Sequence, residues 1–379
     1  MNQAMSASPA FRISIGSYVL SVIMIFNFIT PTAVVPRSVP IIMLSLIPVL
    51  IILGNNLLEK NSRFEKRSFL FLLTLTALAL FTANIQNLLN LYFLFLFQLL
   101  ASKYPEGITP DRNNRILLFI GAASLTLQIL YYSQTYFTES GRTGLGTDPN
   151  FSGLLILLFV FYLQKENRKL AFIPLIPAIW FFQSRTLLLS ILIFFALEML
   201  SKTAFNKLLF KILHPFLVIV VAHAAVILLS AVMLASFTFK NNTTSGISDR
   251  LVNMTDQSNS GRLTANVYWA TKVLKGEYMV KSENIEEKNF NTKLVIMPHN
   301  SLLNLLISST TLFGLIYLLY VSHLLKPLLN PSSISYFYSF LFYSLFLHGL
   351  FNSIYLFPFL MVFLLKPSVQ AQPQPIETS

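Results

Sequence analysis

Long apolar stretches separated by short polar segments make up most of this chain of 379 residues. Twelve stretches have the pattern of membrane-spanning helices, for which ~20 apolar residues cross a hydrocarbon core of ~30 Å. Several are shorter than this, so two of them are candidates for re-entrant or broken helices. The expected spans are 13–35, 39–56, 68–84, 86–102, 115–133, 151–164, 168–182, 185–200, 208–238, 299–324, 334–348 and 352–365.

One long polar segment, 239–298, separates the ninth span from the tenth. Within it, Ser260 suits a helix N-cap, and four apolar residues follow at helical spacing. These four residues are Leu263, Val267, Ala270 and Leu274. Tyr268 and Trp269 flank this face, which indicates a helix lying on the membrane interface.

The composition supports the same class of protein. The chain is 54% hydrophobic and only 11% charged, whereas soluble domains are about a quarter charged. An outer-membrane barrel would show short alternating segments instead. We therefore predict an all-α polytopic membrane protein with about 12 transmembrane helices. Its expected parts are helices one to nine in 1–238, a periplasmic loop with an amphipathic helix in 239–298, helices ten to twelve in 299–366 and a cytoplasmic tail in 367–379. The absence of cysteine excludes disulfides, thiolate catalysis and cysteine-ligated metal.

The positive charges indicate the orientation. One set of loops carries sixteen lysines and arginines, and the short loops of the other side carry only Arg37, Arg142 and Arg185. Cytoplasmic loops are the positive ones, so both termini are expected in the cytoplasm and the 239–298 segment outside. The net charge of +12 is then mostly a consequence of topology, and we reject nucleic acid as a partner.

Four polar stretches precede or begin helices on the outer side, namely 141–150, 184–186, 260–262 and 298–301. Helix N-termini present free N–H groups and partial positive charge, and three of the stretches add an arginine. Together they predict an anion site suited to phosphate or diphosphate. No carboxylate cluster lies nearby in sequence to hold a metal, so arginine would neutralise the charge that develops on a leaving group.

Each of these residues also has an ordinary explanation. Arg185 suits an interfacial anchor, Arg262 a solvated loop residue, and His299 an interfacial histidine. Asn150 and Asn300 suit helix caps. The other four histidines are interpreted as packing or interface residues: His214, His223, His323 and His348.

At these positions the chain resembles the O-antigen polymerase and ligase superfamily of bacterial envelope glycosyltransferases. The resemblance covers about span five to span ten. The motifs that carry it are Gly141-Arg142 with Asp148-Pro149-Asn150, Ser184-Arg185-Thr186, Ser260-Gly261-Arg262 with Trp269, and His299-Asn300-Ser301-Leu302-Leu303. The chain departs from the family at two places where glycine is often found, which here hold Thr310 and Phe313.

The resemblance implies a C-type, metal-independent inverting glycosyltransferase without a cofactor, acting in the bacterial inner membrane with its site facing the periplasm. It implies that Arg185 and Arg262 hold the diphosphate of an undecaprenyl-diphosphate-linked oligosaccharide and that His299 serves at the reaction centre. Arg142, Asn150 and Asn300 are further candidates for substrate binding. The expected partners are this donor, an acceptor glycan or lipid A–core, membrane lipid and a chain-length regulator protein.

Three functions are compatible with the sequence, and we prefer them in the following order. The first is a polysaccharide polymerase that transfers the glycan to a hydroxyl of another lipid-linked repeat unit. The second is a ligase that transfers the glycan to lipid A–core oligosaccharide. The third is a flippase or other glycolipid transporter, which the scarcity of ionisable groups within the spans disfavours if transport is coupled to protons.

Overall fold

The computed structural model describes residues 66–82, 85–103, 107, 112–136, 144–145, 148–166, 168–200, 214–236, 257–283, 297–330, 332–353 and 355–365. These residues form twelve α-helices and two short 3-10 helices, and no β-strand occurs among them. The α-helices are α3 (Lys66–Phe81), α4 (Ile85–Lys103), α5 (Arg112–Tyr136), α6 (Pro149–Glu166), α7 (Phe172–Phe182), α8 (Arg185–Leu200), α10 (Pro215–Ser236), α12 (Gln257–Leu274), α14 (Ser301–Ser308), α15 (Thr311–Leu325), α16 (Ile334–Leu345) and α17 (Leu356–Leu364). The 3-10 helices are η1 (Arg168–Ala171) and η2 (Lys326–Leu328).

The all-α prediction is confirmed for the described residues, whereas the number of twelve spans stays a prediction. By length and composition, two helical segments in this part of the chain are able to cross a membrane, α10 and Thr311–Leu328. The expected spans 13–35 and 39–56, and the expected tail 367–379, lie outside the described residues. Helices α14 and α17, with 8 and 9 residues, are too short to cross a bilayer alone.

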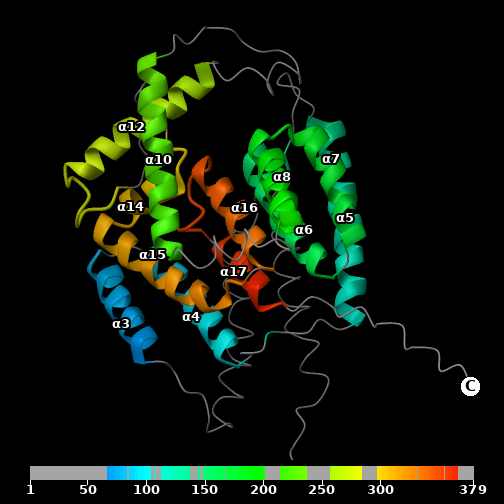
Figure 1. The fold of residues 1–379 in the computed structure, drawn as a ribbon, viewed down its shortest axis with the longest axis horizontal. Coiled ribbons are helices and arrows are strands. Elements are labelled where there is room, and N and C mark those ends of the chain that lie inside the picture. The colour runs from blue at the N-terminus through cyan, green and yellow to red at the C-terminus, as the bar shows by residue number, and fades with distance from the viewer. Residues whose placement is uncertain are drawn as a thin grey trace, which may run out of the picture.

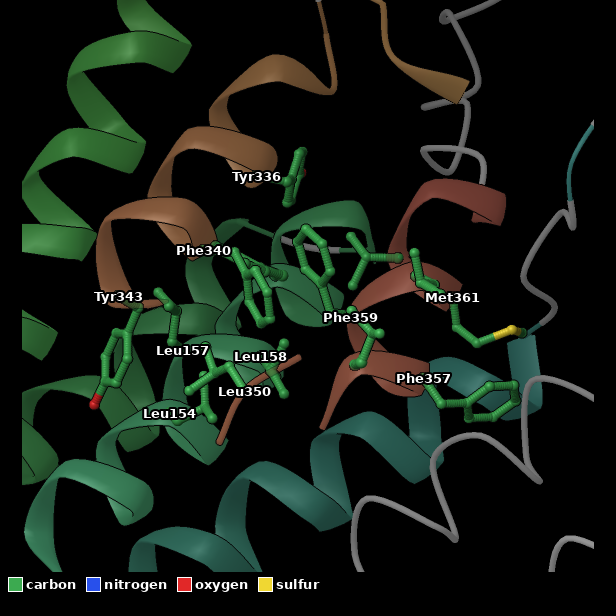
Figure 2. Close-up of a cluster of buried hydrophobic side chains, with 14 of the residues drawn as sticks. Leu154, Leu157, Leu158, Tyr336, Phe340, Tyr343, Leu350, Phe357, Phe359 and Met361 are labelled. Atoms are coloured by element: carbon green, nitrogen blue, oxygen red, sulfur yellow. The ribbon is translucent and has the colours of Figure 1, made fainter. Parts of the chain in front are cut away.

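Helix α6 forms the centre of the core. Ten consecutive residues, 154–163, are buried on every side of the helix, as expected for a helix that is apolar all round. Leu154, Leu157 and Leu158 face α16 and α17 (Figure 2). The hydroxyl of Tyr162 donates to the carbonyl of Pro358 at 2.8 Å, which fixes α6 against α17.

Helices α16 and α17 lie between the group α5 to α8 and the group α10, α12, α14 and α15 (Figure 1). Phe340 of α16 stacks on Phe359 of α17 with ring centroids 3.7 Å apart. On its other side α16 packs closely on α8, where Ser339 Oγ donates to the carbonyl of Ser190 at 2.7 Å. Small polar residues permit this close approach of two helices.

Helix α12 crosses α10 and packs beside α14 (Figure 1). It begins at Gln257, so Ser260 lies inside the helix and is not its N-cap. The packed face is also different from the predicted one: Ala265, Trp269 and Ala270 are buried, whereas Leu274 is 87% exposed. A cluster that includes Tyr278, Leu303 and Ile307 covers this face. Trp269 is therefore a core residue of this cluster, and the prediction that it lies at the membrane interface was wrong.

The predicted tenth span is broken into α14 and α15 at Ser309 and Thr310. The chain that follows α12 packs against this break: the amide of Thr311 donates to the carbonyl of Tyr278 at 2.8 Å, and the amide of Leu312 donates to that of Met279 at 3.3 Å. Thr310 has φ 74° and ψ 147°, a backbone region that only glycine occupies without strain. The backbone at Thr310 thus has a conformation that is typical of glycine.

Replacing Thr310 with glycine is expected to stabilise the protein. Relief of the backbone strain contributes about 1–3 kcal/mol. The change loses a weak cap, in which Thr310 Oγ1 accepts from the amide of Phe313 at 3.3 Å, and adds backbone entropy to the unfolded chain, which costs about 0.4–1 kcal/mol. The net gain, about 1 kcal/mol, should raise the Tm of the detergent-solubilised protein. Thr311→Gly, one residue later and inside α15, should lower it; a lower Tm for Thr310→Gly as well would contradict the prediction.

Candidate functional site

The N-termini of α6 and α8 lie side by side. The carboxylate of Asp148 accepts from the amide of Asn150 at 2.7 Å and so caps the start of α6. Gln183 adopts a left-handed conformation after α7, and Ser184 then begins α8 by accepting from the amide of Leu187 at 3.3 Å. The same hydroxyl donates to Asn150 Oδ1 at 3.0 Å. This hydrogen bond joins two of the predicted stretches and places Arg185, the first residue of α8, beside the start of α6.

Tyr343 of α16 contacts the place where the starts of α6 and α8 meet. Its buried hydroxyl donates to the backbone carbonyl of Asn150. Gly153 lies one turn along α6, where an added Cβ would come within 2.6 Å of the Tyr343 hydroxyl oxygen and 3.3 Å of Leu187 Cβ. The position of Asn150 therefore depends on the hydroxyl group of Tyr343 and on the absence of a side chain at Gly153.

Gly153→Ala is expected to destabilise the protein by about 1–3 kcal/mol, because overpacking a buried contact forces side chains and backbone to shift. In a Tyr343→Phe background, which removes the clashing oxygen, the same change should cost less. Denaturant unfolding of the two single variants and the double variant measures this coupling. Strictly additive losses would show that the hydroxyl is not the atom that excludes the methyl group.

The third N-terminus is that of α14, which His299 and Asn300 precede. Asn300 is fully buried and caps the helix, since its Oδ1 accepts from the amide of Leu303 at 3.1 Å. Its Nδ2 lies 3.5 Å from the carbonyl oxygen of His223 on α10. Both polar groups of the Asn300 side chain are thus used inside the protein, and they fix the backbone next to His299.

The start of α14 also holds the segment that follows α16. Ser301 Oγ donates to the carbonyl of Leu347 and accepts from the amide of Leu350. Gly349 has φ 74°, so the chain turns sharply directly after His348. As a result the imidazole of His348 lies against that of His299, with ring centroids 5.6 Å apart.

Arg262 on α12 is the charged residue that acts on this pair of histidines. Its positive charge acts on both His299 and His348, and the negative charge of Asp148 acts on His348. Burial, followed by the charges of Arg262 and His348, lowers the pKa of His299 from 6.5 to about 3. Burial also lowers the pKa of His348, while Asp148 opposes this effect. Both imidazoles are therefore neutral near pH 7, each with one nitrogen lone pair.

The structure thus brings together residues that are far apart in sequence. His299 contacts His348, and the charges of Arg262 and Asp148 act on His348. Asn150 and Arg185 adjoin this group through Ser184. No hydrogen bond or charge interaction of Arg185 with His299 is seen among the described residues, and Arg142 lies outside them. His348 was interpreted from sequence as a packing residue, and only the turn at Gly349 and the contacts of Ser301 reveal its position.

Among the described residues, no group of three or more histidine, aspartate or glutamate side chains is placed to hold a metal ion. Comparisons of the chain with protein-family models, curated proteins and solved structures found no match. The site must therefore be interpreted from its own chemistry.

Proposed function

We propose that the protein is a polysaccharide polymerase of the bacterial inner membrane that transfers a glycan from undecaprenyl diphosphate to a hydroxyl group of another lipid-linked repeat unit. The observation that carries the proposal is the contact of the His299 and His348 imidazoles before α14 and beside the first turn of α6, within reach of the positive charge of Arg262. A guanidinium suits a diphosphate, and the start of α8 adds the positive end of a helix dipole. A neutral imidazole suits the acceptance of a proton from a hydroxyl group.

Several exposed apolar faces favour a membrane setting for this site. Helix α10 exposes Leu217, Val221, Leu228 and Leu229, each by more than half of its surface. Trp180 of α7 is 64% exposed. Soluble monomers rarely leave such large apolar areas uncovered, whereas hydrocarbon tails of lipid would cover them. The periplasmic orientation of the site rests on the distribution of lysines and arginines in the loops.

In the proposed reaction the acceptor hydroxyl oxygen attacks the anomeric carbon of the donor sugar. The bond from this carbon to the diphosphate oxygen breaks, and its electron pair leaves with undecaprenyl diphosphate. The proton of the hydroxyl passes to the neutral imidazole of His299. Arg262 stabilises the negative charge that grows on the leaving diphosphate, and Arg185 at the start of α8 contributes from the other side. Asn300 positions His299 through the cap of α14 and does not itself contact the substrate.

Deleting the gene in its host and separating the envelope glycans on a gel tests this function. Loss of a polymerase should leave lipid A–core capped with a single repeat unit. Loss of a ligase would instead leave uncapped core, with the glycan stranded on its lipid carrier. An unchanged ladder of glycan lengths would reject both transferase functions.

A further inference from the structure

Four rings form a continuous row at the site, in the order Tyr355, Phe151, His348 and His299. Successive ring centroids are 6.3, 4.9 and 5.6 Å apart. The rings come from three places in the fold: the first turn of α6, the segment between α16 and α17, and the residues before α14. All four are half-buried, so the row leads from the start of α17 to the proposed base.

The centre of this row contains a polar atom that the protein leaves unpaired. Nδ1 of His348 is buried, and none of the described residues forms a hydrogen bond with it. Buried polar atoms almost always have a partner, and leaving one without a partner is costly. The charged and titratable groups that act on His348 are Asp148 before α6, Arg262 on α12 and His299 before α14.

We propose that this row is a subsite for a sugar ring of the lipid-linked glycan, in which Nδ1 of His348 forms a hydrogen bond with a sugar hydroxyl group. This inference rests on the proposed function. A pyranose has one face of C–H groups, which packs on aromatic rings, and hydroxyl groups at its rim that either donate or accept. Because neighbouring side chains cover Nδ1 in this structure, they must rotate slightly to admit the hydroxyl.

Two other parts of the substrate fit the row less well. A polyprenyl tail would pack on the rings but would leave Nδ1 of His348 without a partner. A diphosphate would approach Asp148, whose negative charge acts on the middle of the row. The diphosphate is better placed at Arg262, so the row is left for the sugars that adjoin the reacting bond.

The test measures initial rates of chain elongation by the purified full-length protein in lipid nanodiscs, at increasing concentrations of the single lipid-linked repeat unit isolated from the deletion strain. His348→Leu keeps the bulk of the side chain but removes Nδ1, and it should raise KM about 3- to 10-fold, the value of one hydrogen bond. His348→Asn places an amide near Nδ1 and should restore most of the affinity. In both variants kcat should stay within about twofold of the wild-type value, because uniform binding affects KM alone.

A second variant, Phe151→Leu, removes an aromatic ring from the row and should also raise KM. Its matched control is Phe346→Leu, an exposed ring in the segment after α16 that does not belong to the row. Wild-type KM values in His348→Leu and Phe151→Leu, or a loss confined to kcat, would overturn the subsite while leaving the proposed function intact. Failure of the wild-type protein to elongate the repeat unit would overturn the proposed function, and the subsite with it. The Tm of each variant shows that it is folded.

Discussion

Arg262→Ala should lower the rate of glycan polymerisation by about 10²–10³-fold, the usual effect of removing one preorganised group that stabilises charge in a transition state. Arg262 lies on α12, which packs on α10 and α14, and its charge acts on His299 and His348. The loss should be seen in kcat, because the diphosphate gains its full charge only as the glycosidic bond breaks. Envelope glycans of the complemented deletion strain, and initial rates of the purified protein, measure the effect.

Lys272→Ala is the matched control for this experiment. Lys272 lies on the same helix, about three turns further along, and its ammonium contacts the carboxylate of Glu277 at 3.0 Å near the surface. Removing it should leave the rate within about twofold, because exposed ion pairs contribute little. Arg262→Lys should fall between the two variants, since lysine keeps the charge but loses the planar fork. Wild-type chain lengths in Arg262→Ala, at an equal protein level, would reject a catalytic function of this arginine.

His299→Ala should reduce kcat/KM by about 10²-fold, the lower end of the usual contribution of a general base, because a base of lowered pKa accepts a proton less readily. The size of this loss should not depend on pH between about 5 and 8. The pKa of His299 is lowered to about 3, so the free protein keeps the neutral imidazole, which is the form able to accept a proton, throughout this range. Dividing the wild-type kcat/KM by that of His299→Ala at each pH isolates the contribution of the imidazole from titration of the substrate.

A ratio that falls as the pH is lowered through 6.5 would show that His299 titrates normally and is not shielded by burial and by Arg262. A ratio near one at every pH would remove His299 from the reaction. His299→Gln is the companion variant, since it retains hydrogen bonding without basicity. If glutamine restores the wild-type rate, His299 orients the acceptor and does not take its proton.

Much of the helical pattern was predictable because apolar runs and their polar ends are local features. The predicted range 185–200 coincides with α8 (Arg185–Leu200), and the predicted starts of α3, α4 and α6 lie within about two residues of those observed. The break at Thr310 was not predictable from composition, because neither glycine nor proline is found there. It depends on the chain at Tyr278 and Met279, which lies about 30 residues earlier and hydrogen-bonds with the first amides of α15.

The site was predictable only in part, because some of its residues are placed by contacts with parts of the chain that are distant in sequence. Arg185, Arg262 and His299 begin or precede polar-to-apolar transitions and are therefore visible in the pattern. His348 lies at the end of an apolar run with no such signal, and Ser301 brings it to the site from 47 residues away in sequence. Trp269 was misplaced because an amphipathic helix gives the same pattern whether its apolar face meets lipid or another helix.

The enclosure of α6 also constrains the order in which the chain is assembled during synthesis. Its surface is covered partly by α17, through the hydrogen bond of Tyr162 with Pro358, and its first turn is held by Tyr343. These two contacts join residues 196 and 193 positions apart. Until α16 and α17 leave the ribosome, α6 lacks the cover of α17 and its first turn lacks the hydrogen bond from Tyr343. A chain that ends before α16 and α17 would therefore leave α6 without these two contacts, and the apolar surface of α6 would be exposed to proteases.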